Sequence, residues 1–132
     1  MNSSEIHNVL SRDPHTCRYY VGVFPSDKIP DIAKFPAAMV INTDKHHEKG
    51  SHWLALYIEN PKTLDFFDSF GLPPDIYGED ISRFVKTYEE VHWNSVPVQS
   101  LTSNVCGQFC IYFIVKRCQG FCMKMIDFLF NY

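Results

Sequence analysis

The sequence predicts an α+β fold. Residues 53–58 are all apolar or aromatic, which is typical of a strand that is covered on both faces. From Asp80 onward, apolar residues recur at the i, i+3, i+4, i+7 spacing of an amphipathic helix. An unbroken apolar run, residues 109–115, follows Cys106 and belongs in a core. The 132 residues suffice for a single domain, 1–132, around one such core.

Composition excludes several classes of protein. Apolar residues make up 45% of the chain and aromatic residues 15%, so the chain is expected to fold. The formal net charge is −3 without a run of Lys or Arg, which argues against a dedicated nucleic-acid binder. The first residues lack a signal-peptide pattern, and no apolar segment is long enough to cross a bilayer. We therefore expect no secretion and no membrane partner, but an intracellular location (cytoplasm or nucleus) or a place in a virion.

The five cysteines are expected to be reduced thiols, because their number is odd and no secretory signal is evident. Four of them, at residues 106, 110, 118 and 122, are spaced C-x3-C, C-x7-C and C-x3-C. Zinc ribbons use paired C-x2-C spacings instead. Small, inert packing residues are the simpler interpretation of Cys110, Cys118 and Cys122. The sequence therefore predicts no metal site and no cofactor.

The first third of the chain predicts one helix and two strands. Apolar residues at helical spacing indicate a helix over residues 5–11, behind a cap at Ser3 or Ser4. Residues 19–24 are rich in strand-forming types, and residues 37–41 have the pattern of a buried strand.

The middle of the chain predicts a β-hairpin. A strand over residues 52–58 and a second over residues 63–67 flank the turn sequence Asn60-Pro61-Lys62. His52 begins the first strand and Asp68 ends the second. In an antiparallel pair, the start of one strand lies beside the end of the other. We therefore expect these two side chains at the same edge of the sheet.

The last part predicts two further helices and one edge strand. Asp80 is the expected N-cap of the amphipathic helix that reaches Tyr88. Residues 92–98 suit an edge strand, because Pro97 cannot occupy a central ladder position, and this strand leads to Gln99. The run after Cys106 fits a strand or a helix by its periodicity. The segment from Met123 to Phe130 has its apolar residues on one helical side.

Four polar residues of this layout match the needs of thiol chemistry. A cysteine nucleophile needs a base for its proton and a third group to orient that base, and Cys106, His52 and Asp68 can supply these roles. Attack on a carbonyl also needs oxyanion donors, and the Gln99 amide and the Cys106 backbone N–H are the candidates. Each residue alone has a simpler explanation as a surface, turn or packing residue. The combination is what favours catalysis.

The segments around these residues resemble the adenovirus protease (adenain) family of cysteine endopeptidases, which is related to SUMO-protease-like enzymes. The resemblance extends over nearly all of the chain, with the motifs in the same order and at similar spacing. The segments that carry it are Asn2-Ser3-Ser4-Glu5, residues 17–23, residues 40–43, Gly50-Ser51-His52-Trp53-Leu54-Ala55, Phe67-Asp68-Ser69-Phe70-Gly71, and Gln99 ahead of Ser103-Asn104-Val105-Cys106-Gly107-Gln108.

The resemblance implies a papain-like α+β fold, a mixed sheet flanked by helices with the nucleophile at the N-terminus of a central helix. It implies that Cys106 is the nucleophile, that His52 is the general base and acid, and that Asp68 is the orienting carboxylate, where viral members commonly have Glu. Gln99 and the Cys106 backbone N–H become oxyanion donors, and Trp53 shapes the substrate site. The implied activity is hydrolysis of peptide bonds near Gly, as in capsid maturation of viruses or virus-like transposons, by a monomer acting on a protein or peptide.

The chain departs from the family in two respects. It has no counterpart of the family's C-terminal helical region after Cys122, so a compact domain is expected. Known viral members are activated by a disulfide-linked peptide and by DNA, yet the corresponding region around Tyr88 has no Cys and the chain is acidic. The family resemblance allows an activating peptide or DNA, but this sequence does not support either.

Three other functions stay open at the level of the sequence. A protease for ubiquitin-like (SUMO-type) tails is the first, since such tails also end in Gly-Gly. An acetyltransferase on a related His–acid–Cys fold is the second. The third is a non-catalytic interaction module, which the intact set of His52, Asp68, Gln99 and Cys106 disfavours.

Overall fold

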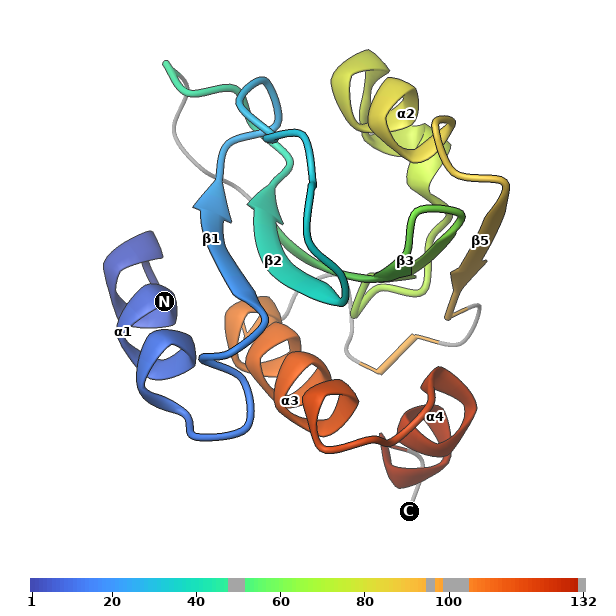
Figure 1. Cartoon of the computed structure of the whole chain (residues 1–132). Helices are drawn as coiled ribbons and strands as arrows, with labels where there is room; N and C mark the ends of the chain where they lie inside the picture. The colour runs from blue at the N-terminus through green and yellow to red at the C-terminus, as the bar shows by residue number, and fades with distance from the viewer. Residues whose placement is uncertain (48–51, 95–96, 99–104, 131–132) are drawn as a thin grey trace.

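The computed structural model describes residues 1–47, 52–94, 97–98 and 105–130. Its centre is a five-stranded sheet whose spatial order follows the chain (Figure 1). The strands are β1 (Tyr20–Phe24), β2 (Ala37–Asn42), β3 (Trp53–Asn60), β4 (Thr63–Phe67) and β5 (Glu90–Trp93). The two outer pairs, β1 with β2 and β4 with β5, are parallel, whereas β2, β3 and β4 pair antiparallel. The sheet is therefore mixed.

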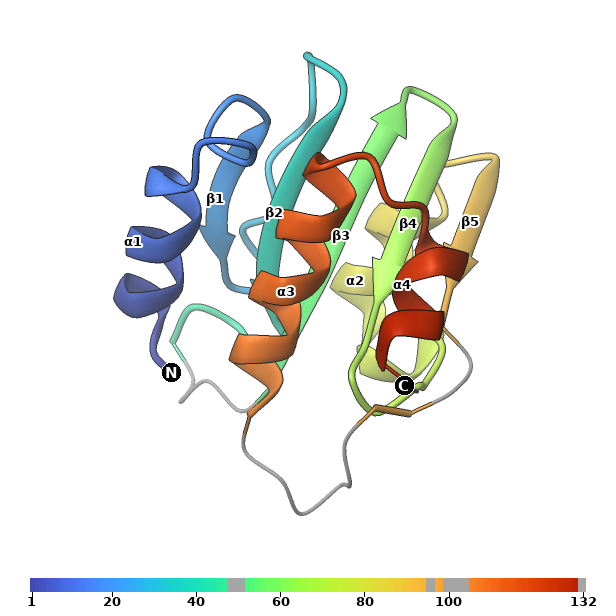
Figure 2. The same cartoon turned by 90° about the horizontal axis from the view of Figure 1, so that it is seen from below.

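Helices cover both faces of this sheet (Figures 1 and 2). On one face lie α1 (Ser3–Arg12), α3 (Cys106–Cys118) and α4 (Met123–Phe130). On the other face lies α2 (Glu79–Val85), which follows the short 3-10 helix η1 (Pro74–Tyr77). The predicted α+β class and the mixed, helix-flanked sheet are confirmed. Among the helices of the described chain, none has the length and apolar character needed to cross a bilayer.

Strands such as β2 are apolar at every position because helices cover both faces of the sheet. Along β2, Ala38 and Val40 face the α1 and α3 side, whereas Met39 and Ile41 face the α2 side. All six residues of β2 are buried. The alternation of side chains across a strand thus supplies two hydrophobic clusters from one run of residues.

The run after Cys106 is a helix, so the alternative of a strand is wrong. The helix α3 spans 13 residues, longer than most strands. Cys110, Phe113 and Ile114 are fully buried at helical spacing against the sheet. The ring of Phe113 stacks on Phe67 of β4, with ring centroids 4.8 Å apart. Cys106 is therefore the first residue of the central helix.

Two helix caps differ from the sequence-based expectation. The N-cap of α1 is Asn2, whose side chain accepts from the Glu5 backbone N–H while the Glu5 side chain accepts from the Asn2 N–H. This capping box satisfies two N–H groups at once, which Ser3 and Ser4, inside the helix, do not do. The N-cap of α2 is Gly78, and Asp80 lies in its first turn.

The edge strand is confirmed as an edge but is shorter than expected. Strand β5 covers Glu90–Trp93 and is the last strand of the sheet. Its residues pair with β4 in parallel, beginning with Thr63 opposite Glu90. Pro97 and Val98 lie beyond it, although the Val98 backbone N–H still donates to the Ser69 carbonyl at 2.8 Å.

Candidate active site

The β3–β4 hairpin brings His52 and Asp68 together, as the sequence predicts. His52 directly precedes β3 and Asp68 directly follows β4, so the antiparallel pairing places both at one end of the sheet. The Nε2 atom of His52 donates to Oδ1 of Asp68 at 2.7 Å. Both residues are buried, with exposed fractions of 6% for His52 and 0% for Asp68. A buried carboxylate at this distance fixes the tautomer and the plane of the imidazole.

Further donors hold Asp68 in its charged form. The backbone N–H groups of Phe70 and Leu72 donate to its two carboxylate oxygens at 3.0 and 3.1 Å. The Tyr77 hydroxyl donates a short hydrogen bond to Oδ2. Burial alone raises the pKa of Asp68, but the hydrogen bonds from His52, Tyr77 and the Phe70 N–H lower it further than burial raises it. Asp68 therefore stays an anion beside the imidazole.

The backbone of Asp68 is held by a residue from a distant part of the chain. The Asn94 side chain accepts from the Asp68 N–H at 2.9 Å and donates to the Asp68 carbonyl at 2.5 Å. Asn94 is 1% exposed and directly follows β5. These two bonds fix the main chain that carries the carboxylate, in addition to the bonds that fix the carboxylate itself.

The imidazole of His52 is packed as well as hydrogen-bonded. The Phe70 ring stacks on it with centroids 4.1 Å apart and planes 5° apart. Since Nε2 is bonded to Asp68, Nδ1 is the ring atom left for Cys106. Burial lowers the pKa of His52, but hydrogen bonds and charge interactions with Asp68 and Cys106 raise it to about 9. At neutral pH the ring is thus a stable cation.

Cys106 completes the group at the N-terminus of α3. Its thiol interacts with the His52 ring and with the backbone N–H groups of Trp53 and Gly107. Burial raises the pKa of the thiol, but these interactions and the charge of His52 lower the pKa below its ordinary value. The residue is 7% exposed. The described geometry therefore stabilises a thiolate–imidazolium pair, the reactive form of a cysteine nucleophile.

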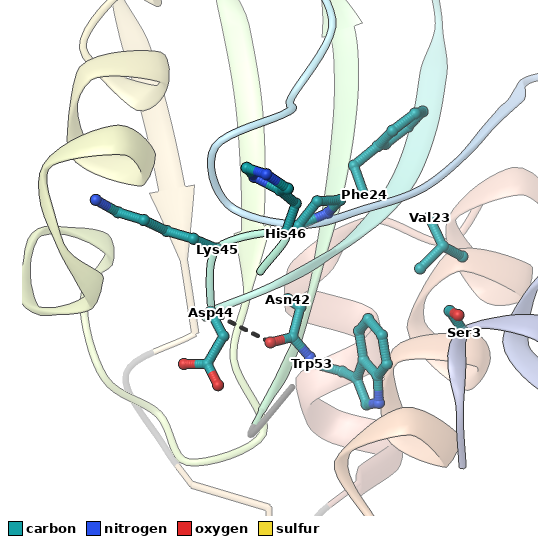
Figure 3. Close-up of a pocket in the computed structure, with 9 residues that line it drawn as sticks. Ser3, Val23, Phe24, Asn42, Asp44, Lys45, His46 and Trp53 are labelled. Atoms are coloured by element: carbon teal, nitrogen blue, oxygen red, sulfur yellow. Dashed lines mark hydrogen bonds between the residues drawn. The ribbon is translucent and has the colours of Figure 1, made fainter. Parts of the chain in front are cut away.

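Trp53 lies beside this pair and lines a hollow. Figure 3 shows its indole with Asn42 on one side and Ser3 on the other, below Val23. The hollow has a volume of about 240 Å³, and its apolar walls are Val23, Phe24, Pro25 and Trp53. The indole Nε1–H donates a hydrogen bond to the Met1 carbonyl at 3.1 Å. The residue expected to shape the substrate site thus adjoins an open space.

Gln99, the expected oxyanion donor, lies outside the described residues, so its position and its role stay predictions. The role of the Cys106 backbone N–H in that oxyanion hole also stays a prediction. Among the other thiols, Cys110 is fully buried and its pKa is raised well above the ordinary value by that burial, which suits the packing role expected for it.

One further group of potential metal ligands occurs away from the cysteines. Asp27, His46 and His47 each place a ligand atom within 4.8 Å of the others at the surface. The carboxylate of Asp27 is already occupied, because it accepts from both the ring and the backbone N–H of His46. We assign this group a structural role in joining the turn after β1 to the segment after β2.

Three positioning residues escape the sequence analysis. In the sequence, Phe70 resembles an ordinary turn residue, Asn94 falls inside the predicted strand 92–98, and Tyr77 follows two prolines in a loop. Their common property, contact with Asp68 or His52, depends on tertiary structure. Only the proximity of Phe70 to Asp68 in the chain offers a signal that could have found one of them.

Comparison with known proteins gives two partial likenesses. No protein-family model matches the chain. A protein of Acanthamoeba polyphaga mimivirus, whose name classes it provisionally among the thiol proteases, is 28% identical over 102 residues. That alignment covers 71% of this chain and 34% of the viral protein, so the chain spans about a third of that relative. The crystal structure of a protease of ASFV superposes with a TM-score of 0.45 and 20% identity, covering 64% of this chain and 36% of that one.

Proposed function

We propose that this chain is a cysteine endopeptidase of papain-like, adenain-like type, a single domain over residues 1–132. The observation that carries the proposal is the buried His52–Asp68 hydrogen bond at the N-terminus of α3, where His52 lowers the pKa of the buried Cys106 thiol. Core packing does not require these three polar side chains to be buried together, and their burial is costly unless they act on one another. The likeness to a mimivirus protein named as a thiol protease supports the same activity.

The reaction follows from the state of the pair. The Cys106 thiolate attacks the carbonyl carbon of the scissile peptide bond, forming a C–S bond while the carbonyl electrons move to oxygen. The Cys106 backbone N–H and the Gln99 amide stabilise this oxyanion. The C–N bond then breaks as His52 gives its proton to the leaving amine, and a thioester remains. His52 next takes a proton from water as the water oxygen bonds to the thioester carbon, and the C–S bond breaks. The acid product leaves, and the Cys106 thiolate and the protonated His52 are restored.

Asp68 acts on His52 and not on the substrate. Its hydrogen bond to Nε2 keeps Nδ1 directed toward the thiol, and its negative charge stabilises the imidazolium. The hydroxyl and the N–H groups around Asp68 keep the carboxylate ionised through the cycle.

The proposed substrates are proteins cut near Gly, in the maturation of capsid proteins of a virus or a virus-like transposon. Two features support this choice. The motifs around the site resemble adenain, and the relative of known source is a viral protein. A site walled by an indole at Trp53 favours a substrate residue with a small side chain. We propose that the enzyme works as a monomer, within a cell or a virion.

Substitution of Cys106 tests the activity. Gly-containing fluorogenic peptides should be hydrolysed by the natural chain, and Cys106→Ala should abolish turnover. Cys110→Ala is the matched control, because Cys110 lies one helical turn further along α3 and is fully buried away from solvent. That control should retain turnover. Hydrolysis that survives Cys106→Ala would contradict the proposal.

A substrate panel separates the proposed class from its neighbours. Peptides with Gly near the scissile bond, ubiquitin-like conjugates and acetyl-CoA should be offered to the same preparation. Peptide cleavage alone supports the endopeptidase, and preferential cleavage of conjugates would assign the ubiquitin-like specificity instead. Consumption of acetyl-CoA, or binding of a partner without any turnover, would overturn the proposal.

A further inference from the structure

We propose that Met1 is a positioning residue of the active site, which holds the Trp53 indole as one wall of the substrate channel. This role rests on the proposed function, because it takes Trp53 to border a peptide substrate. Its physical content concerns Met1, Trp53 and Gly107, and it can be tested by structure-sensitive probes without turnover.

The first observation is a hydrogen bond across the whole N-terminal half of the fold. The Trp53 Nε1–H donates to the Met1 carbonyl at 3.1 Å, although 52 residues separate them in sequence. An indole has one polar donor, so this bond selects one orientation of the ring. Trp53 is only partly buried, and packing alone therefore restrains it less than a core aromatic residue.

The second observation is the space above Gly107. A Cβ atom added to Gly107 would lie 3.3 Å from Cβ of Met1 and 3.4 Å from Cδ1 of Trp53. It would also lie 3.4 Å from Cδ1 of Ile6. Met1 and Trp53 thus converge on the one residue of the first turn of α3 that has no side chain. A larger residue at position 107 would fit tightly against these three side chains.

The third observation links this packing to the nucleophile. The backbone N–H groups of Trp53 and Gly107 are two of the groups that lower the pKa of the Cys106 thiol. Met1 contacts the side chain of one and packs over the other. Met1 therefore adjoins both residues, by a hydrogen bond from the indole of Trp53 and by its Cβ over the position that a side chain of residue 107 would occupy.

Helix α1 gives Met1 a firm support. The capping box between Asn2 and Glu5 fixes the first turn, and the Ile6 N–H donates to the Asn2 carbonyl at 3.2 Å. Ile6 and Leu10 anchor the helix in the core with no exposed surface. The Met1 carbonyl is thus presented by an ordered helix start, while the Met1 residue itself is 37% exposed.

The expected consequence is an effect on substrate binding that leaves the chemical step intact. The acid–base pair is fixed by Asp68, Phe70 and Asn94, none of which involves Met1. Loss of the Met1 contact should let the indole rotate, so the channel loses one wall. The Michaelis constant should rise about 3- to 10-fold, the size expected for one hydrogen bond, with little change in kcat.

The experiment compares the natural chain with a chain that begins at Asn2, released from a fusion by a specific protease. The capping box is retained in this variant, because it uses only Asn2 and Glu5. Trp53→Phe removes the donor and keeps an aromatic wall, and Val9→Ala on the exposed side of α1 is the control. Met1 removal and Trp53→Phe should be strongly non-additive, since both break one bond.

Two readouts need no peptide hydrolysis. In a Trp93→Phe background, Trp53 is the one remaining tryptophan, and its emission should shift to longer wavelength when Met1 is removed. Labelling of Cys106 by iodoacetamide should keep its rate within about 2-fold, because a small reagent needs no wall, whereas a peptidyl chloromethyl ketone should react several-fold more slowly.

The outcomes distinguish this inference from the proposed function. An unchanged emission and an unchanged ratio of the two labelling rates would overturn the role of Met1, whether or not peptides are cleaved. A fall of both labelling rates together would also overturn it, because Met1 would then act on the nucleophile and not on the wall. Absence of peptide cleavage, with the emission shift and the altered ratio present, would refute the endopeptidase and leave the Met1 contact established.

Discussion

Two buried aspartates three residues apart, one inside β4 and one just after it, have opposite functions in this fold. Asp65 lies within β4 and is 3% exposed, and Asp68 follows the strand and is 0% exposed. Asp65 accepts from Nε of Arg117 at 2.8 Å and from Nδ1 of His92 at 3.1 Å. Asp68 accepts from His52, which in turn interacts with a thiol. Both acids are buried and both accept from a histidine, but Asp65 also accepts from Arg117 and its histidine is bonded to Glu90, whereas the histidine of Asp68 lies beside the Cys106 thiol.

The partner decides whether an acid can take part in chemistry. The guanidinium of Arg117 keeps its protons at any physiological pH, and it is fixed over the Tyr57 ring at 4.2 Å. The Asp65–Arg117 pair therefore joins β4 to α3 and transfers nothing. His52 can release its proton, with a pKa of about 9, so the carboxylate beside it becomes a means of directing that proton.

The largest effect should separate the two acids by activity. Asp68→Asn should lower kcat by about 10²- to 10⁴-fold, because an amide neither stabilises the imidazolium nor selects its tautomer. Asp65→Asn should leave kcat near that of the natural chain. Initial rates with a Gly-containing peptide measure both variants. Equal losses of kcat in the two variants would break the comparison.

Stability should show the reverse order. Asp65→Asn should lower the free energy of unfolding by about 3 kcal/mol, because it leaves the Arg117 side chain, 11% exposed, without its closest anion. Asp68→Asn should cost less, since its amide still accepts hydrogen bonds and His52 can become neutral. Urea unfolding followed by circular dichroism gives both values. A greater loss of stability in Asp68→Asn would contradict this assignment.

The pH dependence sharpens the role of Asp68. The thiolate–imidazolium pair exists above the lowered pKa of Cys106 and below the pKa of His52, about 9. The value of kcat/KM should therefore fall as the pH rises through about 9, when His52 loses the proton that the leaving amine needs. In Asp68→Asn this alkaline limb should move to lower pH, because Asp68 raises the pKa of His52. If the alkaline limb of kcat/KM does not move in Asp68→Asn, a group other than His52 determines its pH.

The smallest effect concerns Tyr77. Tyr77→Phe removes the hydroxyl that donates to Oδ2 of Asp68, so Asp68 should become a stronger acceptor for His52. The alkaline limb should then move to higher pH, opposite to the shift in Asp68→Asn, with a loss of kcat of about 3- to 10-fold. Tyr88→Phe, beyond the end of α2, is the matched control and should change neither quantity. A downward shift in Tyr77→Phe would refute the donor role.

The sequence pattern was enough to predict those elements that are determined by residues close to one another in the chain. The bounds of β4 were predicted to the residue, because a turn precedes it and a polar residue ends it. The adjacency of His52 and Asp68 followed from the geometry of a hairpin alone. The cap of α1 was misplaced because Asn, Ser and Ser stand side by side and all favour caps, and the deciding partner was Glu5.

Tertiary contacts decided what the patterns left open. The run after Cys106 is a helix because its buried face meets β3 and β4, and periodicity over seven apolar residues contains no such information. The contacts of Tyr77, Asn94 and Met1 join segments that are 9, 26 and 52 residues apart. A single sequence gives no sign of such pairs. The residues that position the site could therefore not be predicted, whereas the proposed reacting residues could.

The amide of Asn94 has a consequence for how this fold can vary. Its two bonds to the Asp68 backbone close a loop of the chain that includes η1, α2 and β5, so the position of the acid is set where the loop closes. The turn between α2 and β5 lies inside that loop and away from its closure. Residues gained or lost there during evolution leave the acid in register with the histidine. This stretch is therefore where relatives of different length can diverge without losing the geometry of the site.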